Sequence, residues 1–131
     1  MSHSVQEMWA ADSASRRLGI ELDEVGDGRA RVRMTVVGWM LNGHGICHGG
    51  LVFTLADTAF SLACNSGEDA VVAAACDVVF VAPAREGDVL VAEAAERTRF
   101  GRSGVYDVSV RREDGTAIAE FRGLSRVIPR D

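Results

Sequence analysis

The chain has no long apolar run and no recognisable secretory signal. Hydrophobic residues make up 47% of its 131 positions, yet no apolar stretch approaches the roughly 20 residues that span a lipid bilayer. The N-terminus lacks a basic segment followed by an apolar one, which would mark a secretory signal. We therefore expect a cytoplasmic globular protein that does not bind membranes.

Paired cysteines and excess positive charge are also missing. Cys47, Cys64 and Cys76 form neither an even framework nor a CxxC motif, so reduced thiols are expected. The formal net charge of −5 argues against nucleic-acid binding, although a local basic cluster could still hold a small anionic ligand. No repeat, linker or low-complexity tract is visible, and the length suits a single domain over residues 1–131.

Apolar periodicity divides the chain into a helix, two strands, one long helix and four strands. We expect these elements, in order, at residues 4–17, 20–25, 30–37, 49–66, 70–82, 89–99, 105–111 and 116–128. Residues 1–17 would form an N-terminal helical segment. Short turns such as Gly26-Asp27-Gly28 favour antiparallel pairing. The predicted fold class is therefore α+β, with a curved antiparallel sheet of about six strands wrapped around one long central helix.

The run of valine and alanine at residues 70–82 is almost uninterrupted, with Asp77 as its one charged residue. Such a run is typical of a strand that is covered on both faces. One chain has a single core-facing side of the sheet, so further cover is needed. We interpret this as a sign of a second subunit.

Residues 42–58 contain the strongest candidates for chemistry. A glycine-rich loop, Asn42-Gly-His-Gly-Ile-Cys-His48-Gly49-Gly50, runs directly into an apolar helix in which Asp57 is the only carboxylate. An ionised carboxylate is unfavourable in apolar surroundings unless a partner or a function compensates it. Asp57 could be a structural partner of an arginine or of the backbone, but its setting favours a catalytic role.

The motif of Asn42, His48, Gly49 and Gly50, followed by Asp57 in Leu-Ala-Asp-Thr-Ala, resembles the hotdog-fold acyl-CoA thioesterases, most closely their phenylacetate-pathway (PaaI-type) branch. Later segments resemble the same branch: Ala-Cys76-Asp77-x-x-Phe80-x-x-Pro83, Gly87-Asp88 and Gly104-Val-Tyr-Asp-Val-Ser-Val. The resemblance implies hydrolysis of an acyl-CoA, with an aromatic, phenylacetyl-like acyl group as the expected substrate. It also implies a homodimer as the minimal active unit, a homotetramer as the assembly, and no cofactor beyond the coenzyme A of the substrate.

By match to the motif, Gly49 would offer its backbone N–H to the thioester carbonyl, with Asn42 helping. His48 would shape the turn and contact the thioester, and Asp57 would act as nucleophile or general base. The first N–H groups of a helix suit this task because they lack internal acceptors and lie at its positive end. Asn42 could instead serve only the turn, and His48 could simply bond to backbone.

Spacing along the helix adds a requirement of its own. Gly49 and Asp57 are eight residues apart, which places them about 12 Å apart along one helix. That is too far for both to act on one carbonyl. Two antiparallel helices in a dimer would bring Gly49 of one chain near Asp57 of the other.

Substrate-binding candidates complete the predicted site. They are Gly50, Thr58, Ser61, Arg99, Arg102 and Gly104. Thr58 and Ser61 carry hydroxyls on or near the helical face of Asp57, and Ser61 could hold water or bond to the backbone. The arginines flank the turn at residues 100–104 and could bind the phosphates of coenzyme A, although arginines on strands are commonly solvated edges.

Metal binding is the least favoured chemistry. His44 and His48, with Cys47 between them, have zinc-like spacing, but no second Cys/His pair exists and the remaining His3 lies at the tail. Two other functions stay open beside thioester hydrolysis. One is hydration or dehydration of an acyl-CoA with His48 as the base, and the other is a non-enzymatic acyl-CoA sensor.

Overall fold

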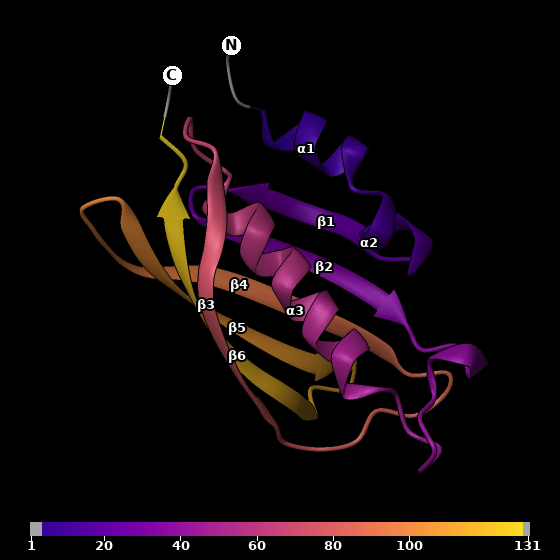
Figure 1. Cartoon of the computed structure of the whole chain (residues 1–131). Helices are drawn as coiled ribbons and strands as arrows, with labels where there is room; N and C mark the ends of the chain where they lie inside the picture. The colour runs from indigo at the N-terminus through magenta and orange to yellow at the C-terminus, as the bar shows by residue number, and fades with distance from the viewer. Residues whose placement is uncertain (1–3, 130–131) are drawn as a thin grey trace.

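A computed structural model describes residues 4–129, which form a six-stranded antiparallel sheet and one long helix. The strands are β1 (Glu21–Gly26), β2 (Arg29–Thr35), β3 (Val71–Phe80), β4 (Val89–Phe100), β5 (Ser103–Arg112) and β6 (Ala117–Val127). They lie in the order β1-β2-β4-β5-β6-β3, and α3 (Gly49–Cys64) crosses them (Figure 1). The predicted fold class is confirmed. No helix in this part of the chain is long and apolar enough to cross a membrane.

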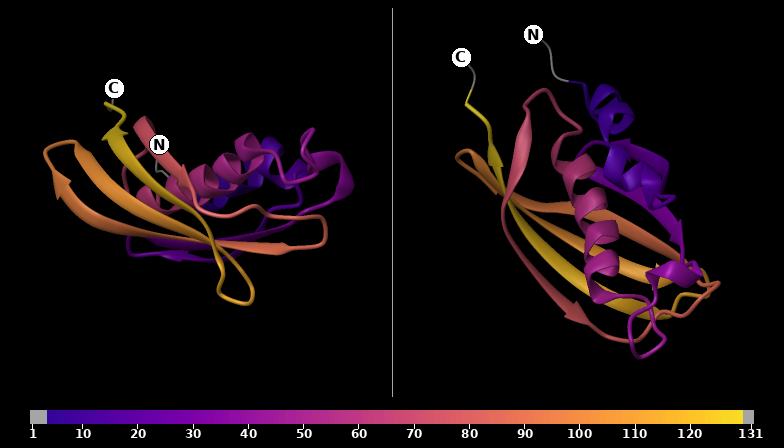
Figure 2. Two further views of the ribbon diagram at one scale, coloured as in Figure 1. Left: turned by 90° about the horizontal axis from the view of Figure 1, so that it is seen from below. Right: turned by 45° about the vertical axis from the view of Figure 1, so that its right-hand side comes forward.

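The core lies between α3 and the concave face of the sheet, which curves around the helix (Figure 2). Strand alternation produces this face, since Ala30, Val32 and Met34 of β2 point inward. β6 approaches the helix most closely at Gly123, where an added Cβ would lie 2.7 Å from the ring of Phe60. A side chain at this position would therefore displace the helix that carries the candidate catalytic residue.

The C-terminal end of α3 differs slightly from the prediction. The helix ends at Cys64, and the side chain of the next residue, Asn65, fixes this end. Its amide donates to the carbonyls of Ser61 at 2.8 Å and Val71 at 2.9 Å, and its oxygen accepts the N–H of Val71 at 2.8 Å. Asn65 thus ends the helix two residues before the predicted end at residue 66 and joins it to β3.

The N-terminal segment contains two short helices, α1 (Val5–Ala11) and α2 (Ser13–Arg17), so the prediction of one continuous helix is wrong. Asp12 separates them. Its N–H donates to the carbonyl of Trp9, and its carboxylate accepts the N–H of Ser15 as the N-cap of α2. The first residues of the predicted 1–17 segment, including His3, lie outside the described residues.

β3 is an edge strand whose apolar side chains are largely exposed in a single chain. Val72 is 49% exposed, Val79 60% and Phe80 53%. β6 pairs with one edge of β3 over its length, and the opposite edge of β3 is the border of the sheet. An exposed apolar edge favours pairing with another chain, in agreement with the sequence prediction that this run needs further cover.

Candidate active site

The loop before α3 is shaped by Asn42. Its side-chain oxygen accepts the backbone N–H groups of His44 at 2.9 Å and Ile46 at 3.3 Å. A bridge between Leu41 and Cys47 closes the base of the loop. Asn42 therefore performs the turn role that the sequence left open, and its side chain also reaches the groove described below.

His48 is the N-cap of α3. Its Nδ1 accepts the backbone N–H of Gly50 at 3.0 Å, so in the neutral imidazole the proton is assigned to Nε2. His48 shapes the turn as predicted. The same bond uses the N–H of Gly50, which makes Gly50 a less suitable donor to substrate.

Gly49 begins α3 with its backbone N–H directed away from the helix. Within residues 4–129 this N–H has no hydrogen-bond acceptor, and it lies at the positive end of a 16-residue helix. An added Cβ would stand 3.1 Å from the ring of Phe80. The absence of a side chain at this position thus lets the Phe80 ring pack directly against the backbone of Gly49.

A groove of about 420 Å³ opens beside Gly49. It is lined mainly by apolar residues of the loop, α3, the end of β3 with the segment after it, and β6: Ile46, Cys47, Val52, Phe80, Val81, Pro83 and Ile118, together with Asn42. Sequence reasoning did not identify this groove. In the sequence, Phe80 drew notice only as part of the family motif. An aromatic residue in a strand that otherwise consists mostly of valine and alanine could have indicated the groove.

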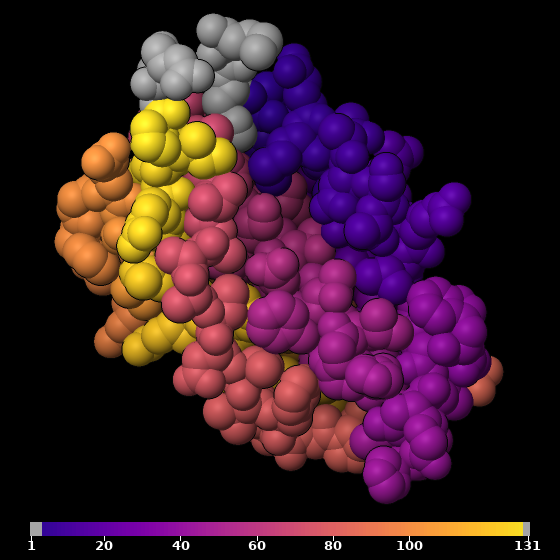
Figure 3. All heavy atoms as spheres, viewed as in Figure 1, coloured from indigo at the N-terminus to yellow at the C-terminus, as the bar shows by residue number. Residues whose placement is uncertain are grey.

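Asp57 lies on the open side of α3. The residues of the helix that are not fully buried recur at helical spacing, and they include Gly50, Phe53, Thr54, Asp57 and Ser61. Figure 3 shows α3 visible between the N-terminal segment and β3. Burial raises the pKa of the Asp57 carboxyl, and the negative charge of Asp12 raises it further.

The chain brings some predicted residues together and keeps others apart. Asn42 and Gly49 share one groove, and Ser61 follows Asp57 by one helical turn. Gly49 and Asp57 lie on the same helix at the separation expected from the sequence. A complete set of these groups around one carbonyl therefore requires a second chain.

Thr58 does not face the open side of the helix. It is 6% exposed, and its hydroxyl lies 2.8 Å from that of Ser15 on α2. The prediction that Thr58 binds substrate is not supported by this geometry. The hydroxyl instead anchors the N-terminal segment, and helical spacing alone could not show which neighbour would cover it.

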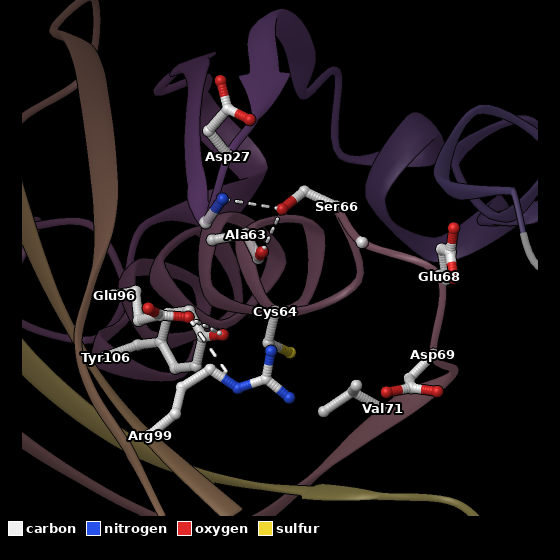
Figure 4. A pocket seen from close by; sticks show the side chains of 12 residues that line it. Asp27, Ala63, Cys64, Ser66, Glu68, Asp69, Val71, Glu96, Arg99 and Tyr106 are labelled. Carbon is white, nitrogen blue, oxygen red and sulfur yellow. Dashed lines mark hydrogen bonds and ion pairs between the residues drawn. The ribbon is translucent and has the colours of Figure 1, made fainter.

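Arg99 lies in a pocket at the opposite end of α3 from Gly49 (Figure 4). The pocket is also lined by Asp27, Glu68, Asp69 and Glu96, and the Arg99 Nε lies 4.0 Å from Glu96 Oε1. Four carboxylates line the pocket that holds this one guanidinium, and their negative charges disfavour a phosphate there. Within one chain, the structure thus argues against Arg99 as a phosphate ligand.

Gly104 and Arg102 have different surroundings. Gly104 is buried in β5, and an added Cβ would stand 3.0 Å from Tyr106 and 3.1 Å from Ser125. The glycine serves packing at this point, and its role in substrate binding stays a prediction. Arg102 is exposed in the turn between β4 and β5, so it remains the better candidate for a phosphate.

An Arg102→Glu variant should raise KM for an acyl-CoA by about tenfold or more, since a hydrogen bond to a charged group contributes roughly 1.5–3 kcal/mol. KM for a short thioester without the nucleotide should stay nearly unchanged. Steady-state thiol release on both substrates measures this, and Arg85→Glu, also exposed, is the matched control. An equal rise for both substrates would remove Arg102 from the phosphate site.

The loop, the free N–H and the half-buried carboxylate suit the hydrolysis of a thioester, and comparison with known families points to the same class of protein. The thioesterase superfamily model matches residues 44–119, and the chain belongs to this superfamily. It is 43% identical to the acyl-coenzyme A thioesterase PaaI of Escherichia coli (strain K12) over 132 residues, covering 98% of this chain and 94% of that protein.

Solved structures show the same relationship. The E. coli PaaI protein from the phenylacetic acid degradation operon superposes with a TM-score of 0.92 at 44% identity, covering 95% of this chain and 90% of that one. A variant of the phenylacetic acid degradation protein PaaI from Thermus thermophilus superposes with a TM-score of 0.84 at 33% identity, covering 89% of this chain and 100% of that one. The resemblance found in the sequence is confirmed.

Proposed function

We propose that the chain hydrolyses an acyl-CoA, with an aromatic, phenylacetyl-like acyl group, to the free acid and coenzyme A. One observation carries this proposal: the Gly49 N–H at the start of α3 has no acceptor among residues 4–129 and opens on an apolar groove. Such a donor can stabilise the oxyanion that forms when a thioester carbonyl is attacked. The similarity to E. coli PaaI supports the same reaction.

The active unit is a homodimer in which β3 and the open side of α3 meet their counterparts. The exposed apolar edge of β3 supports strand pairing between chains. A two-fold axis at this edge would set the two α3 helices antiparallel and place Gly49 of one chain near Asp57 of the other. Two such dimers form the proposed tetramer, and the proposed location is the cytoplasm.

In this site the Gly49 N–H binds the carbonyl oxygen, and Asp57 acts at the carbonyl carbon. As a general base it removes a proton from water while the water oxygen bonds to the carbonyl carbon, and the C–S bond then breaks to release the CoA thiolate, which takes up the proton. As a nucleophile its carboxylate bonds to the carbonyl carbon and displaces the CoA thiolate to give an anhydride, and water then hydrolyses the anhydride to the free acid and the Asp57 carboxylate, with the released proton taken up by the thiolate. Both routes consume one water, need no further cofactor, and give the same products.

The apolar groove beside Gly49 supports an aromatic acyl group. The Phe80 ring stands over the Gly49 backbone and is 53% exposed, so it can pack against a second ring. Asn42 and the loop backbone supply polar groups at the same end.

Hydration or dehydration by His48 is disfavoured by one contact. A base needs a free nitrogen lone pair, but Nδ1 of His48 accepts the Gly50 N–H and Nε2 then carries the proton. For a sensor that binds acyl-CoA without turnover, no contact among residues 4–129 gives specific support.

Thiol release measured across aromatic, short-chain and long-chain acyl-CoAs tests the proposed function. We expect kcat/KM to be highest for arylacetyl-CoA, because its ring fits the groove beside Phe80. A 2-enoyl-CoA that loses its enoyl absorbance without releasing thiol would favour hydration instead. Tight binding of acyl-CoA with no turnover would favour a sensor.

A further inference from the structure

Three side chains join the N-terminal segment to α3 next to Asp57. Ser15 Oγ lies 2.8 Å from Thr58 Oγ1 and 2.7 Å from Asp12 Oδ2. A carboxylate only accepts hydrogen bonds, so the Ser15 hydroxyl donates to Asp12. Since Ser15 has a single hydroxyl proton, the Thr58 hydroxyl must donate to Ser15. The direction of the whole chain of bonds is therefore fixed, from Thr58 to Asp12.

The carboxylate of Asp12 is held in place on both sides. Its second oxygen accepts the backbone N–H of Ser15 at 3.0 Å, and its own backbone N–H donates to the carbonyl of Trp9 at 3.1 Å. Ser15 is only 2% exposed, so its bonds to Asp12 and Thr58 are shielded from water. Because Thr58 directly follows Asp57, these bonds fix a negative charge close to the candidate catalytic carboxylate.

Two thiols within residues 4–129 also interact with Asp57, and neither carries a charge near neutral pH. They are Cys76 on β3 and Cys64 on α3 itself. Burial raises the pKa of both thiols, to about 12 for Cys64. Among residues 4–129, Asp12 carries a charge that acts on Asp57, and this charge adds to the effect of burial on the pKa of Asp57.

We propose that Asp12, held by Ser15 and Thr58, is a positioning residue that keeps a fixed negative charge beside the turn of α3 that carries Asp57. This inference rests on the proposed function of Asp57. A general base works best when its affinity for protons suits the working pH, and an ordinary aspartate is too weak a base near neutrality. The N-terminal segment thereby acts on the reaction without touching the substrate.

Neutralising Asp12 tests this assignment. Asp12→Asn and Asp12→Ser both keep a good N-cap for α2 and remove the charge. Each should move the acid limb of the kcat/KM profile to lower pH. The ratio of kcat/KM at pH 5 to that at pH 8 should rise roughly two- to threefold for a like charge removed at close range. Glu7→Gln, which neutralises an exposed carboxylate on α1, should leave the ratio unchanged.

The outcomes separate this inference from the function on which it rests. The role of Asp12 would be overturned if the acid limb of the kcat/KM profile stayed in place in both Asp12 variants, or if it moved equally in Glu7→Gln. Either result would leave the proposed thioesterase activity standing. A purely structural role would lower kcat/KM equally at all pH values. If the wild type released no thiol from any acyl-CoA, the proposed function would fail, and an NMR titration of the Asp57 carboxyl in wild type and Asp12→Asn would still decide whether Asp12 acts on it.

Discussion

Asp57→Asn should lower kcat by about 10²–10⁴-fold while KM changes little, because the amide can neither accept a proton from water nor attack the carbonyl. Thiol release from the preferred acyl-CoA measures this loss. The matched control is Asp114→Asn, an exposed carboxylate in the turn before β6 whose bond to the Thr116 N–H an asparagine oxygen can keep. Retained turnover in the Asp57 variant would mean that another group does the chemistry.

The same variant should be at least as stable as the wild type at pH 7. The pKa of Asp57 is raised in the folded chain, so its ionisation opposes folding once the pH exceeds the ordinary aspartate value. That opposition grows until the pH passes the folded pKa, and it disappears at lower pH, where the carboxyl is protonated. Thermal melts at pH 7 and pH 4 should therefore show an advantage for the variant at pH 7 that shrinks at pH 4. A catalytic carboxylate retained against stability is a common trade-off.

Gly49→Val should be nearly inactive by itself, yet mixing it with Asp57→Asn should restore activity. The valine side chain would collide with the ring of Phe80, which an added Cβ already approaches to 3.1 Å, and would push the helix start and its N–H away from the substrate carbonyl. Removing one oxyanion donor lowers kcat roughly 10²–10³-fold. When the two variant chains are co-expressed, random assembly should give intact sites in roughly a quarter of cases, since each site draws one group from each subunit.

Two affinity tags on the two chains allow the mixed assemblies to be purified for the activity assay. The control pairs Gly49→Val with a chain that carries both substitutions, and this pair should stay inactive because no intact Gly49 is present. A tagged mixture no more active than its parents would show that Gly49 and Asp57 do not act across a subunit boundary.

Local patterns predicted most of the fold. The alternation along β2 identified its buried face, and the Asp-Gly turn identified the hairpin between β1 and β2, because both signals depend on neighbours in sequence. The long apolar helix with its single carboxylate was also found in this way. In the site, the motif located Asn42, His48 and Gly49. The structure adds the hydrogen bonds that the side chains of Asn42 and His48 accept and the Gly49 N–H that has no acceptor within residues 4–129.

The sequence could not show contacts between distant segments, and the expectations that the structure weakens or overturns depend on such contacts. Thr58 was assigned to substrate because its hydroxyl is next to Asp57, but Ser15, 43 residues earlier, binds that hydroxyl. Asp12 was placed inside a helix, although aspartate is a residue that commonly caps the start of one. Arg99 was assigned to phosphate from its own turn, and most of the carboxylates that surround it come from other loops.

The position of β3 in the sheet has a consequence for synthesis of the chain. β3 is the third strand to be made, but its neighbour in the sheet is β6, the last one, with Val71 opposite Val127. While the ribosome is still adding the C-terminal residues, this apolar strand has neither of its two borders covered. A transcript cut short after β5 should therefore yield aggregated product rather than a shortened enzyme, since open apolar borders promote association between unfinished chains.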